Sequence, residues 1–328
     1  MFNYALDELC AWIEGNGWSE VALQFPEGVK SQAQGIIDAL TERTDASFII
    51  LGDPCYGACD LHQGFEHYAD ALVQFGHSPI PSMQVGANVR FVEMRADIGL
   101  GDLLTEALPL LGDRVGLLAT LQYIDLLPQA ASFLESQGRE AVIGAGDGRI
   151  TYPGQVLGCN HTSAESVASS VDGFLYIGEG NFHALAAALG SRRPVLVLDP
   201  VRGEVRDMEG YRDRLLRQRF GAITQASDAE VFVVIVSGKI GQRRLEKADE
   251  AVSLIRSKGR KAYRLVLEEI SPAALLHYKA DAFVNTACPR VSIDDAGVYK
   301  RPMLTPPELQ IALGERDWAD YVFDVIEG

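Results

Sequence analysis

The chain has 328 residues, of which 47% are hydrophobic and 23% are charged, a composition typical of globular proteins and unlike that of disordered or fibrous chains. Its apolar runs are far shorter than the roughly 20 residues that a membrane-spanning helix needs, which argues against a membrane protein. The 45 acidic and 29 basic residues give a net charge of −16, which disfavours nucleic acid as the main ligand because phosphate binding relies on clustered lysine and arginine.

Short apolar strands alternate with helices, and the same order recurs three times along the chain. The first unit has a predicted helix at 6–13, strands at 21–25, 47–53, 71–77 and 89–93, and a helical stretch ending near 44. The second has strands at 115–120, 141–144, 174–178 and 194–199 and helices at 123–137 and 181–189. The third has strands at 231–237, 262–266 and 282–286 and helices at 242–258 and 272–278. This alternation predicts parallel sheets covered by helices on both faces.

We therefore predict an α/β protein of three similar domains whose short parallel sheets are arranged around a pseudo-threefold centre. The predicted domains are 1–108, 109–222 and 223–328, and the best candidates for linkers are 99–113 and 221–228. The first eight residues carry acids and no basic region, unlike a signal peptide, so we expect a cytoplasmic protein.

The five cysteines are odd in number and widely spaced, which makes a disulfide framework improbable. Cys10 lies within the amphipathic helix pattern and is predicted to be part of the core. Cys59, Cys159 and Cys288 each lie in a loop that follows what we predict to be a central strand of one unit. Because ligands bind at the carboxyl edge of such sheets, three thiolates from three units could meet at one centre.

Soft thiolate ligands suit either zinc or an iron–sulfur cluster. A structural zinc site normally has four ligands at paired spacing, and no Cys-x-x-Cys pair occurs here. Cys55 lies four residues before Cys59, and His161 lies two after Cys159, so a mixed Cys/His zinc site remains open. A cluster held by three cysteines has one iron without a protein ligand, which suggests chemistry at the cluster.

Two further segments follow predicted strands and could line the same edge. The turn at 237–242 precedes a helix, so its amides and Lys239 could hold an anionic group, although a simple tight connection explains it equally well. Gly178 ends a predicted strand, and His183 opens the helix that follows; a purely structural role for the histidine remains open.

Four motifs together resemble the archaeal diphthamide synthase family, and the likeness extends over almost the whole chain. They are GDPCYGACD at 52–60, GEGNFH at 178–183, SGKIGQ at 237–242 and NTACPR at 285–290. The three-unit plan agrees with the three similar domains of that family. Cys55 departs from the residue expected in the first motif, and we interpret it as a bystander.

The resemblance implies that Cys59, Cys159 and Cys288 hold a [4Fe-4S] cluster and that S-adenosylmethionine is the cosubstrate. The reduced cluster would cleave the sulfonium bond to the methionine γ-carbon and release methylthioadenosine. The resulting 3-amino-3-carboxypropyl radical would add to a histidine of elongation factor 2, the first step of diphthamide biosynthesis. The family also implies a homodimer and an electron donor that the sequence does not identify.

The cosubstrate carries a carboxylate, for which we expect Arg290 and the turn at 237–242 to act as clamps, because a guanidinium fork matches a carboxylate. No catalytic residue beyond the cluster is predicted. The predicted cofactor-binding residues are Ser237, Lys239, Gln242, Arg290, Gly178 and His183. Two alternatives remain, namely a structural zinc-binding protein and a small-molecule-binding α/β repeat protein with inert cysteines.

Overall fold

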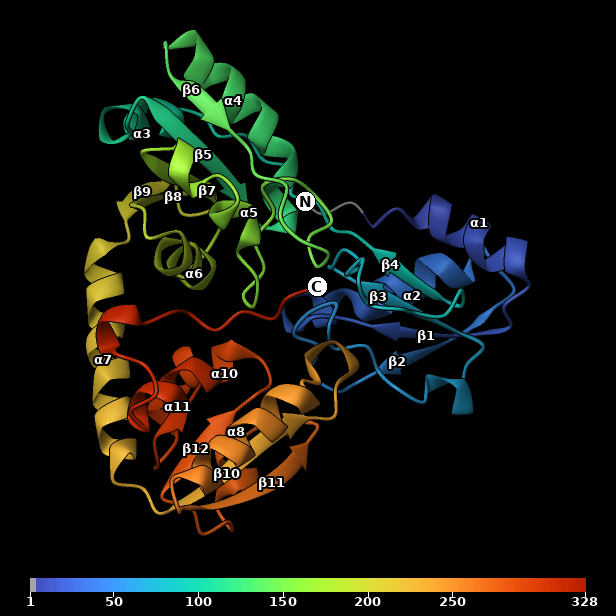
Figure 1. The fold of residues 1–328 in the computed structure, drawn as a ribbon. Helices are drawn as coiled ribbons and strands as arrows, with labels where there is room; N and C mark the ends of the chain where they lie inside the picture. Colours follow the sequence, from blue (N-terminus) through green and yellow to red (C-terminus); the bar gives the residue numbers. More distant parts are fainter. Residues whose placement is uncertain (1–3) are drawn as a thin grey trace.

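The computed structural model describes residues 4–328 and contains three parallel-dominated sheets, each with its own helices (Figure 1). Residues 1–3, with which the first predicted domain and the acidic N-terminal segment begin, lie outside the described residues. In Figure 1 the three units are the blue, green and orange regions, and they meet near the middle of the molecule.

The first unit is a four-stranded parallel sheet with the order β2-β1-β3-β4. Its elements are α1 (Leu6–Asn16), β1 (Glu20–Gln24), α2 (Ala33–Thr41), β2 (Ser47–Leu51), β3 (Ala71–Phe75) and β4 (Val89–Val92). The inner strands are buried along their apolar runs, and Leu23 and Phe25 pack against Leu9 and Ile13 of α1. Cys10 belongs to this core, as the helix pattern predicted.

The second unit is a five-stranded sheet with the order β6-β5-β7-β8-β9. Its strands are β5 (Arg114–Ala119), β6 (Glu140–Val142), β7 (Gly173–Ile177), β8 (Val195–Asp199) and β9 (Glu204–Asp207). Its helices are α3 (Leu103–Ala107), α4 (Leu127–Ser136), α5 (Thr162–Glu165), α6 (Phe182–Ser191) and α7 (Glu209–Ser227). Strand β9, which the sequence did not predict, is antiparallel to β8 and is the exception to the parallel pattern in this sheet.

The third unit is a four-stranded parallel sheet with the order β11-β10-β12-β13. Its strands are β10 (Val231–Ser237), β11 (Lys261–Leu267), β12 (Ala282–Asn285) and β13 (Met303–Leu304). Its helices are α8 (Leu245–Ser257), α9 (Pro272–Leu275), α10 (Pro289–Ile293) and α11 (Pro306–Ala312). The first four strands of every unit therefore share one spatial order, in which the unit's first strand lies between its second and third.

The shared order confirms the predicted α/β class and agrees with three similar units, whereas both predicted linkers are wrong. Residues of 99–113 form α3, and Leu104 and Ala107 pack into the core of the second unit. Helix α7 covers most of 221–228 and continues across residue 222. Its Leu215 packs into the second unit and its Ile223 into the third, so this helix joins two cores. The domain boundaries themselves stay a prediction.

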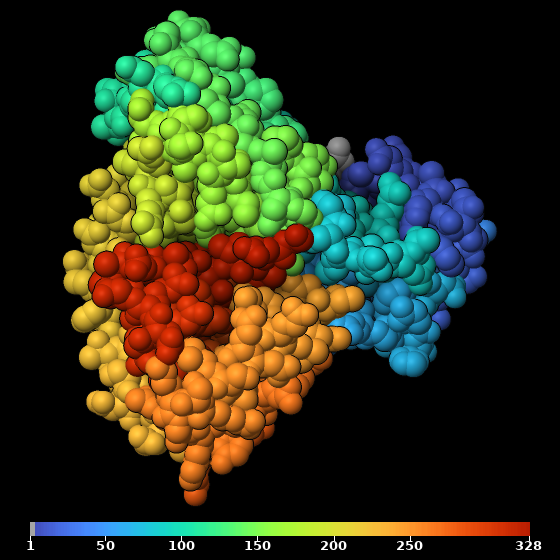
Figure 2. Space-filling view, viewed as in Figure 1, coloured from blue at the N-terminus to red at the C-terminus, as the bar shows by residue number. Residues whose placement is uncertain are grey.

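The C-terminal segment 321–328 runs from the third unit to the centre of the molecule, as the red trace in Figure 1 shows. On the face drawn in Figure 2 it lies between the second and third units and reaches the first. The backbone N–H of Ile326 donates to the carbonyl of Cys159 at 2.8 Å, which ties this segment to a cysteine loop. Within the described chain, no helix combines the length and the apolar character that crossing a membrane requires.

Candidate metal centre

A cavity of about 670 Å³ lies where the three units meet, a size within the usual range of small-molecule sites. Its walls come from loops that follow β2, β3, β5, β6, β7, β10, β11 and β12, so the cavity lies at the carboxyl edges of all three sheets. The predicted site residues on its wall are Cys59, Cys159, Cys288, His183, Lys239, Gln242 and Arg290.

The three cysteines that the sequence selected all line this cavity, one from each unit. Cys159 is buried, Cys59 and Cys288 are partly exposed, and none of the chain's five cysteines forms a disulfide. Only Cys288 follows a central strand, β12. Cys59 and Cys159 follow β2 and β6, which are edge strands, so the prediction of a central strand is wrong for these two. The three loops nevertheless reach one cavity, because all of them leave the carboxyl edge of a parallel sheet.

The thiols are close enough to influence one another electrostatically. Burial raises the pKa of Cys59 to about 11, and the nearby Cys159 adds to the rise. Burial also raises the pKa of Cys288, with further contributions from Cys159 and Cys59. Thiols with such raised pKa values are protonated at neutral pH, and a bound metal with its positive charge is what would hold them as thiolates.

The donor set fits an iron–sulfur cluster better than a zinc ion. Across residues 4–328, no group of three or more His, Cys, Asp or Glu side chains is placed to bind a single metal ion. A cluster does not require three sulfurs to converge on one point, because each thiolate binds a different iron. Three unbonded thiols around a cavity therefore suit a cluster, and the structural zinc alternative finds no support in this geometry.

The Cys59 loop is held against the third unit through Gly241. The Gly241 N–H donates to the Cys59 carbonyl at 3.1 Å, and a Cβ on Gly241 would lie 2.4 Å from the Cα of Cys59. This close approach requires glycine. The next residue, Gln242, donates from Nε2 to the Cys59 sulfur at 3.3 Å, so its amide faces the candidate centre, whereas its predicted contact with the cosubstrate stays a prediction.

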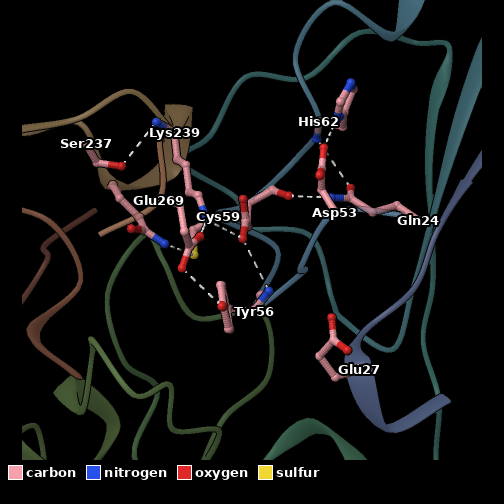
Figure 3. Close-up of polar contacts among 12 residues, drawn as sticks. Gln24, Glu27, Asp53, Tyr56, Cys59, His62, Ser237, Lys239 and Glu269 are labelled. Atoms are coloured by element: carbon pink, nitrogen blue, oxygen red, sulfur yellow. Dashed lines mark hydrogen bonds and ion pairs between the residues drawn. The ribbon is translucent and has the colours of Figure 1, made fainter. Parts of the chain in front are cut away.

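Lys239 is already paired within the protein, in contrast to its predicted role as a free clamp (Figure 3). Its Nζ lies 2.9 Å from Asp60 and 3.3 Å from Glu269, and 4.9 Å above the ring of Tyr56. The hydroxyl of Tyr56 donates to Glu269 at 3.1 Å and closes the group. Because Asp60 and Tyr56 belong to the Cys59 loop and Glu269 to the third unit, this cluster fastens the two units together.

Two predicted ligand-binding residues lie off the cavity wall. Ser237 is buried and its hydroxyl accepts the N–H of Lys239 at 3.1 Å, which makes it part of the turn. Gly178 packs against Tyr176, whose hydroxyl oxygen would lie 2.6 Å from a Cβ at this position. Neither residue is among those that line the cavity, so their roles in cofactor binding stay predictions.

Arg290 and His183 do line the cavity and lie beside each other. Burial lowers the pKa of His183 to about 4, and the positive charge of Arg290 lowers it further, so the imidazole is neutral at physiological pH. The guanidinium of Arg290 lies over the ring of Phe182 and donates to Asp294 at 3.1 Å. Its side chain is 55% exposed, so it can rearrange to meet a ligand carboxylate.

The sequence did not single out Arg149, and it assigned His77 to a surface or packing role; both line the cavity. His77 follows β3 as Cys288 follows β12, so the shared strand order could have indicated it. Arg149 lies in the long loop after β6, and no motif marks it. Cys55, predicted to be a bystander, is also on the wall, where burial raises the pKa of its thiol to about 12.

Comparison with known proteins assigns nearly the whole chain to one group. Residues 25–322 match the model of a family described as putative diphthamide synthesis protein. The 2-(3-amino-3-carboxypropyl)histidine synthase of Pyrococcus horikoshii is 37% identical, over 95% of this chain and 90% of that protein. Subunit 1 of the human enzyme of the same name is 32% identical, over 100% of this chain and 76% of that protein. The crystal structure of Dph2 from Pyrococcus horikoshii with a 4Fe-4S cluster superposes with a TM-score of 0.93 at 35% identity, covering 100% of this chain and 95% of that one.

Proposed function

The chain belongs to the diphthamide synthesis family, and from that premise we propose that it is a 2-(3-amino-3-carboxypropyl)histidine synthase. It transfers the 3-amino-3-carboxypropyl group of S-adenosylmethionine to a histidine of elongation factor 2 and releases methylthioadenosine. This is the first step of diphthamide biosynthesis. The observation that carries the proposal is the placement of three unbonded cysteines, one from each unit, around a single cavity of suitable size.

In this proposal Cys59, Cys159 and Cys288 hold a [4Fe-4S] cluster, as the donor set and the 4Fe-4S cluster of the Pyrococcus structure support. When bound, the cluster supplies the electron that cleaves the sulfonium bond to the methionine γ-carbon. The chain contributes the walls of the site, since loops from all three units line the cavity.

The remaining wall residues bind and orient the cosubstrate. Arg290, whose side chain is 55% exposed, suits the carboxylate at the amino-acid end of S-adenosylmethionine. Gln242 donates to the Cys59 sulfur and thereby fixes the orientation of that ligand. His183 is neutral and lies next to Arg290, so it offers a hydrogen bond without adding charge.

The substrate protein and the assembly are further parts of the proposal. Elongation factor 2 is the target that the function of the relatives implies, and we place the enzyme in the cytoplasm. A homodimer is proposed from the family resemblance, and the mass of the protein in solution tests it.

The deciding experiment is anaerobic purification of the full chain and of three variants, Cys59→Ala, Cys159→Ala and Cys288→Ala. The parent should be brown, with about four iron atoms per chain. With dithionite and S-adenosylmethionine it should form methylthioadenosine, and with elongation factor 2 it should transfer the labelled aminocarboxypropyl group. Each variant should lose iron and at least 100-fold of the activity, because the cluster loses a ligand.

Cys10→Ala is the matched control, since Cys10 lies in the core of the first unit away from the cavity. Cys55→Ala tests whether the fourth thiol on the wall is a bystander, in which case iron content and product formation stay at the parental level. Stoichiometric zinc in a colourless parent would establish the zinc alternative. Unchanged activity in all three cavity variants would establish a protein with inert cysteines.

A further inference from the structure

Arg149 is a buried cation held rigidly at the wall of the cavity. Arg149 is 6% exposed and lies in the loop between β6 and α5. The backbone N–H of Arg149 donates to the Asp147 side chain at 2.9 Å, and Asp147 also accepts two bonds of 3.0 Å from Asn160. The turn that carries the guanidinium is therefore fixed to the residue directly after Cys159.

The guanidinium faces Cys159 and lacks a carboxylate partner. Its Nη2 lies 3.8 Å from the Cys159 sulfur and donates to the carbonyl of Gly241 at 3.2 Å. Its Nε is buried and has no acceptor, and no carboxylate of residues 4–328 forms an ion pair with this side chain. A buried guanidinium is costly unless an anion compensates its charge.

The missing negative charge must come from what the cavity binds. The Cys159 sulfur faces the guanidinium at 3.8 Å, and Cys59 lies on the same cavity wall. As thiolates on a cluster they would place negative charge directly beside Arg149, and one-electron reduction would add one more. A cation at this distance stabilises the more negative, reduced form, and nearby charge is one of the factors that set the potential of such clusters.

We propose that Arg149 is the counter-charge of the cluster: its guanidinium, directed at the Cys159 sulfur, raises the reduction potential of the bound cluster. This is a positioning and electrostatic role, and it rests on the proposed function above. The orientation of Arg149 suits this role, because its Nη2 is directed at the Cys159 sulfur and at the Gly241 carbonyl. Arg290, which is exposed on the same wall, is in the better place for a soluble carboxylate.

The test compares Arg149→Met, which removes the charge and keeps most of the length, with Arg149→Lys, which keeps the charge. Arg43→Met is the control for net charge, since Arg43 pairs with Asp7 on the surface and is not on the cavity wall. Each holoprotein is loaded anaerobically and titrated with dithionite, with the reduced cluster followed by electron paramagnetic resonance. The affinity for S-adenosylmethionine is measured by calorimetry on the same samples.

In Arg149→Met we expect the equilibrium for one-electron reduction to shift against the reduced cluster by at least tenfold, which is about 59 mV. Arg149→Lys should lie between this variant and the parent, Arg43→Met should match the parent, and the affinity for S-adenosylmethionine should stay within threefold. If Arg149→Met fails to retain iron, retention by Arg149→Lys supports the counter-charge, whereas loss in both variants overturns it.

An unchanged potential in fully loaded Arg149→Met overturns the proposal. A tenfold loss of affinity for S-adenosylmethionine at an unchanged potential also overturns it, and would assign Arg149 to the cosubstrate carboxylate. Failure of the proposed function gives a different result, because the parent chain itself would then bind no iron and no titration could begin.

Discussion

Two buried arginines of this molecule are treated in opposite ways. Arg219 of α7 is 1% exposed and forms a two-pronged ion pair with Glu308 of α11, through Nε at 2.7 Å and Nη2 at 2.6 Å. It also donates to the carbonyls of Ser292 and Met303, each at 2.6 Å. Arg149, nearly as buried, has a sulfur, one carbonyl and an Nε without an acceptor.

The presence or absence of a carboxylate partner distinguishes an arginine that stabilises the fold from one that serves a bound ligand. Where α7 joins two cores, the fold supplies a carboxylate, and each of the three guanidinium nitrogens has a hydrogen-bond acceptor. At the cavity the fold supplies none, and the cation is left for a charge that arrives with the ligand. A buried arginine that lacks a carboxylate is thus an indicator of an anionic ligand, and a buried arginine with a complete set of partners is not.

Removal of the structural arginine should have the largest effect on stability. Arg219→Met leaves the Glu308 carboxylate buried without its partner, and we expect the free energy of unfolding to fall by about 3–5 kcal/mol. Chemical denaturation of the metal-free chain measures this. Under the same conditions Arg149→Met should lose less than about 1 kcal/mol, because no buried anion loses its partner.

The double variant Arg219→Met/Glu308→Gln is the control, and it should recover part of the loss because the uncompensated charge is gone. Equal destabilisation by Arg219→Met and Arg149→Met in the metal-free chain would abolish the comparison, since both arginines would then be structural.

Arg244 lies between these extremes and links two cysteine loops. It binds both oxygens of Asp324 in the C-terminal segment, at 3.0 Å and 2.6 Å, and donates to the carbonyls of Thr286 and Ala287 just before Cys288. The same segment holds the Cys159 carbonyl through Ile326. Loss of this arginine should therefore loosen both loops.

For Arg244→Met we expect a loss of about 2–3 kcal/mol in the free energy of unfolding, together with faster release of iron during anaerobic dialysis. Arg264→Met is the matched control, because Arg264 pairs with Asp249 on the surface and both side chains are more than half exposed. Parental iron retention in Arg244→Met would show that the C-terminal segment does not position the cysteine loops.

The strands and the carboxyl-edge location of the site were predictable because a continuous apolar run has few alternatives to a buried parallel strand. Helix α7 was not. Its buried residues, Leu215, Arg219, Ile223 and Ala226, form a narrow stripe that includes a charge, and Gly221 lowers its helix propensity. Tertiary contacts with two cores stabilise this helix, and local sequence does not report them.

The candidate site shows the same limit. The three cysteines could be identified because each lies in a separate loop after a strand. The position of a strand within its sheet could not, and the strand that precedes Cys59 proved to be an edge strand. The partners of Lys239 are Asp60, which is 179 residues away in the sequence, and Glu269. No sequence pattern shows that such distant positions are in contact. The sequence alone therefore cannot distinguish a lysine that binds an anion from one that links two units.

Lys239→Met should give the smallest effect. It distinguishes the two possible roles of Lys239, binding the cosubstrate or linking two units. Loss of the partly buried ion pair with Asp60 should lower the free energy of unfolding by about 1 kcal/mol. This loss is smaller than for Arg244→Met, because the ammonium of Lys239 makes a single contact with its carboxylate whereas the guanidinium of Arg244 makes two. The dissociation constant of S-adenosylmethionine should change by less than about twofold, because the charge of Lys239 is already matched by two carboxylates. Lys247→Met, on an exposed pair of α8, is the control for both measurements. A tenfold weaker cosubstrate affinity at parental stability would reverse the assignment: Lys239 would then hold the carboxylate as its turn suggested, and a complete set of protein partners would no longer mark a charge as structural.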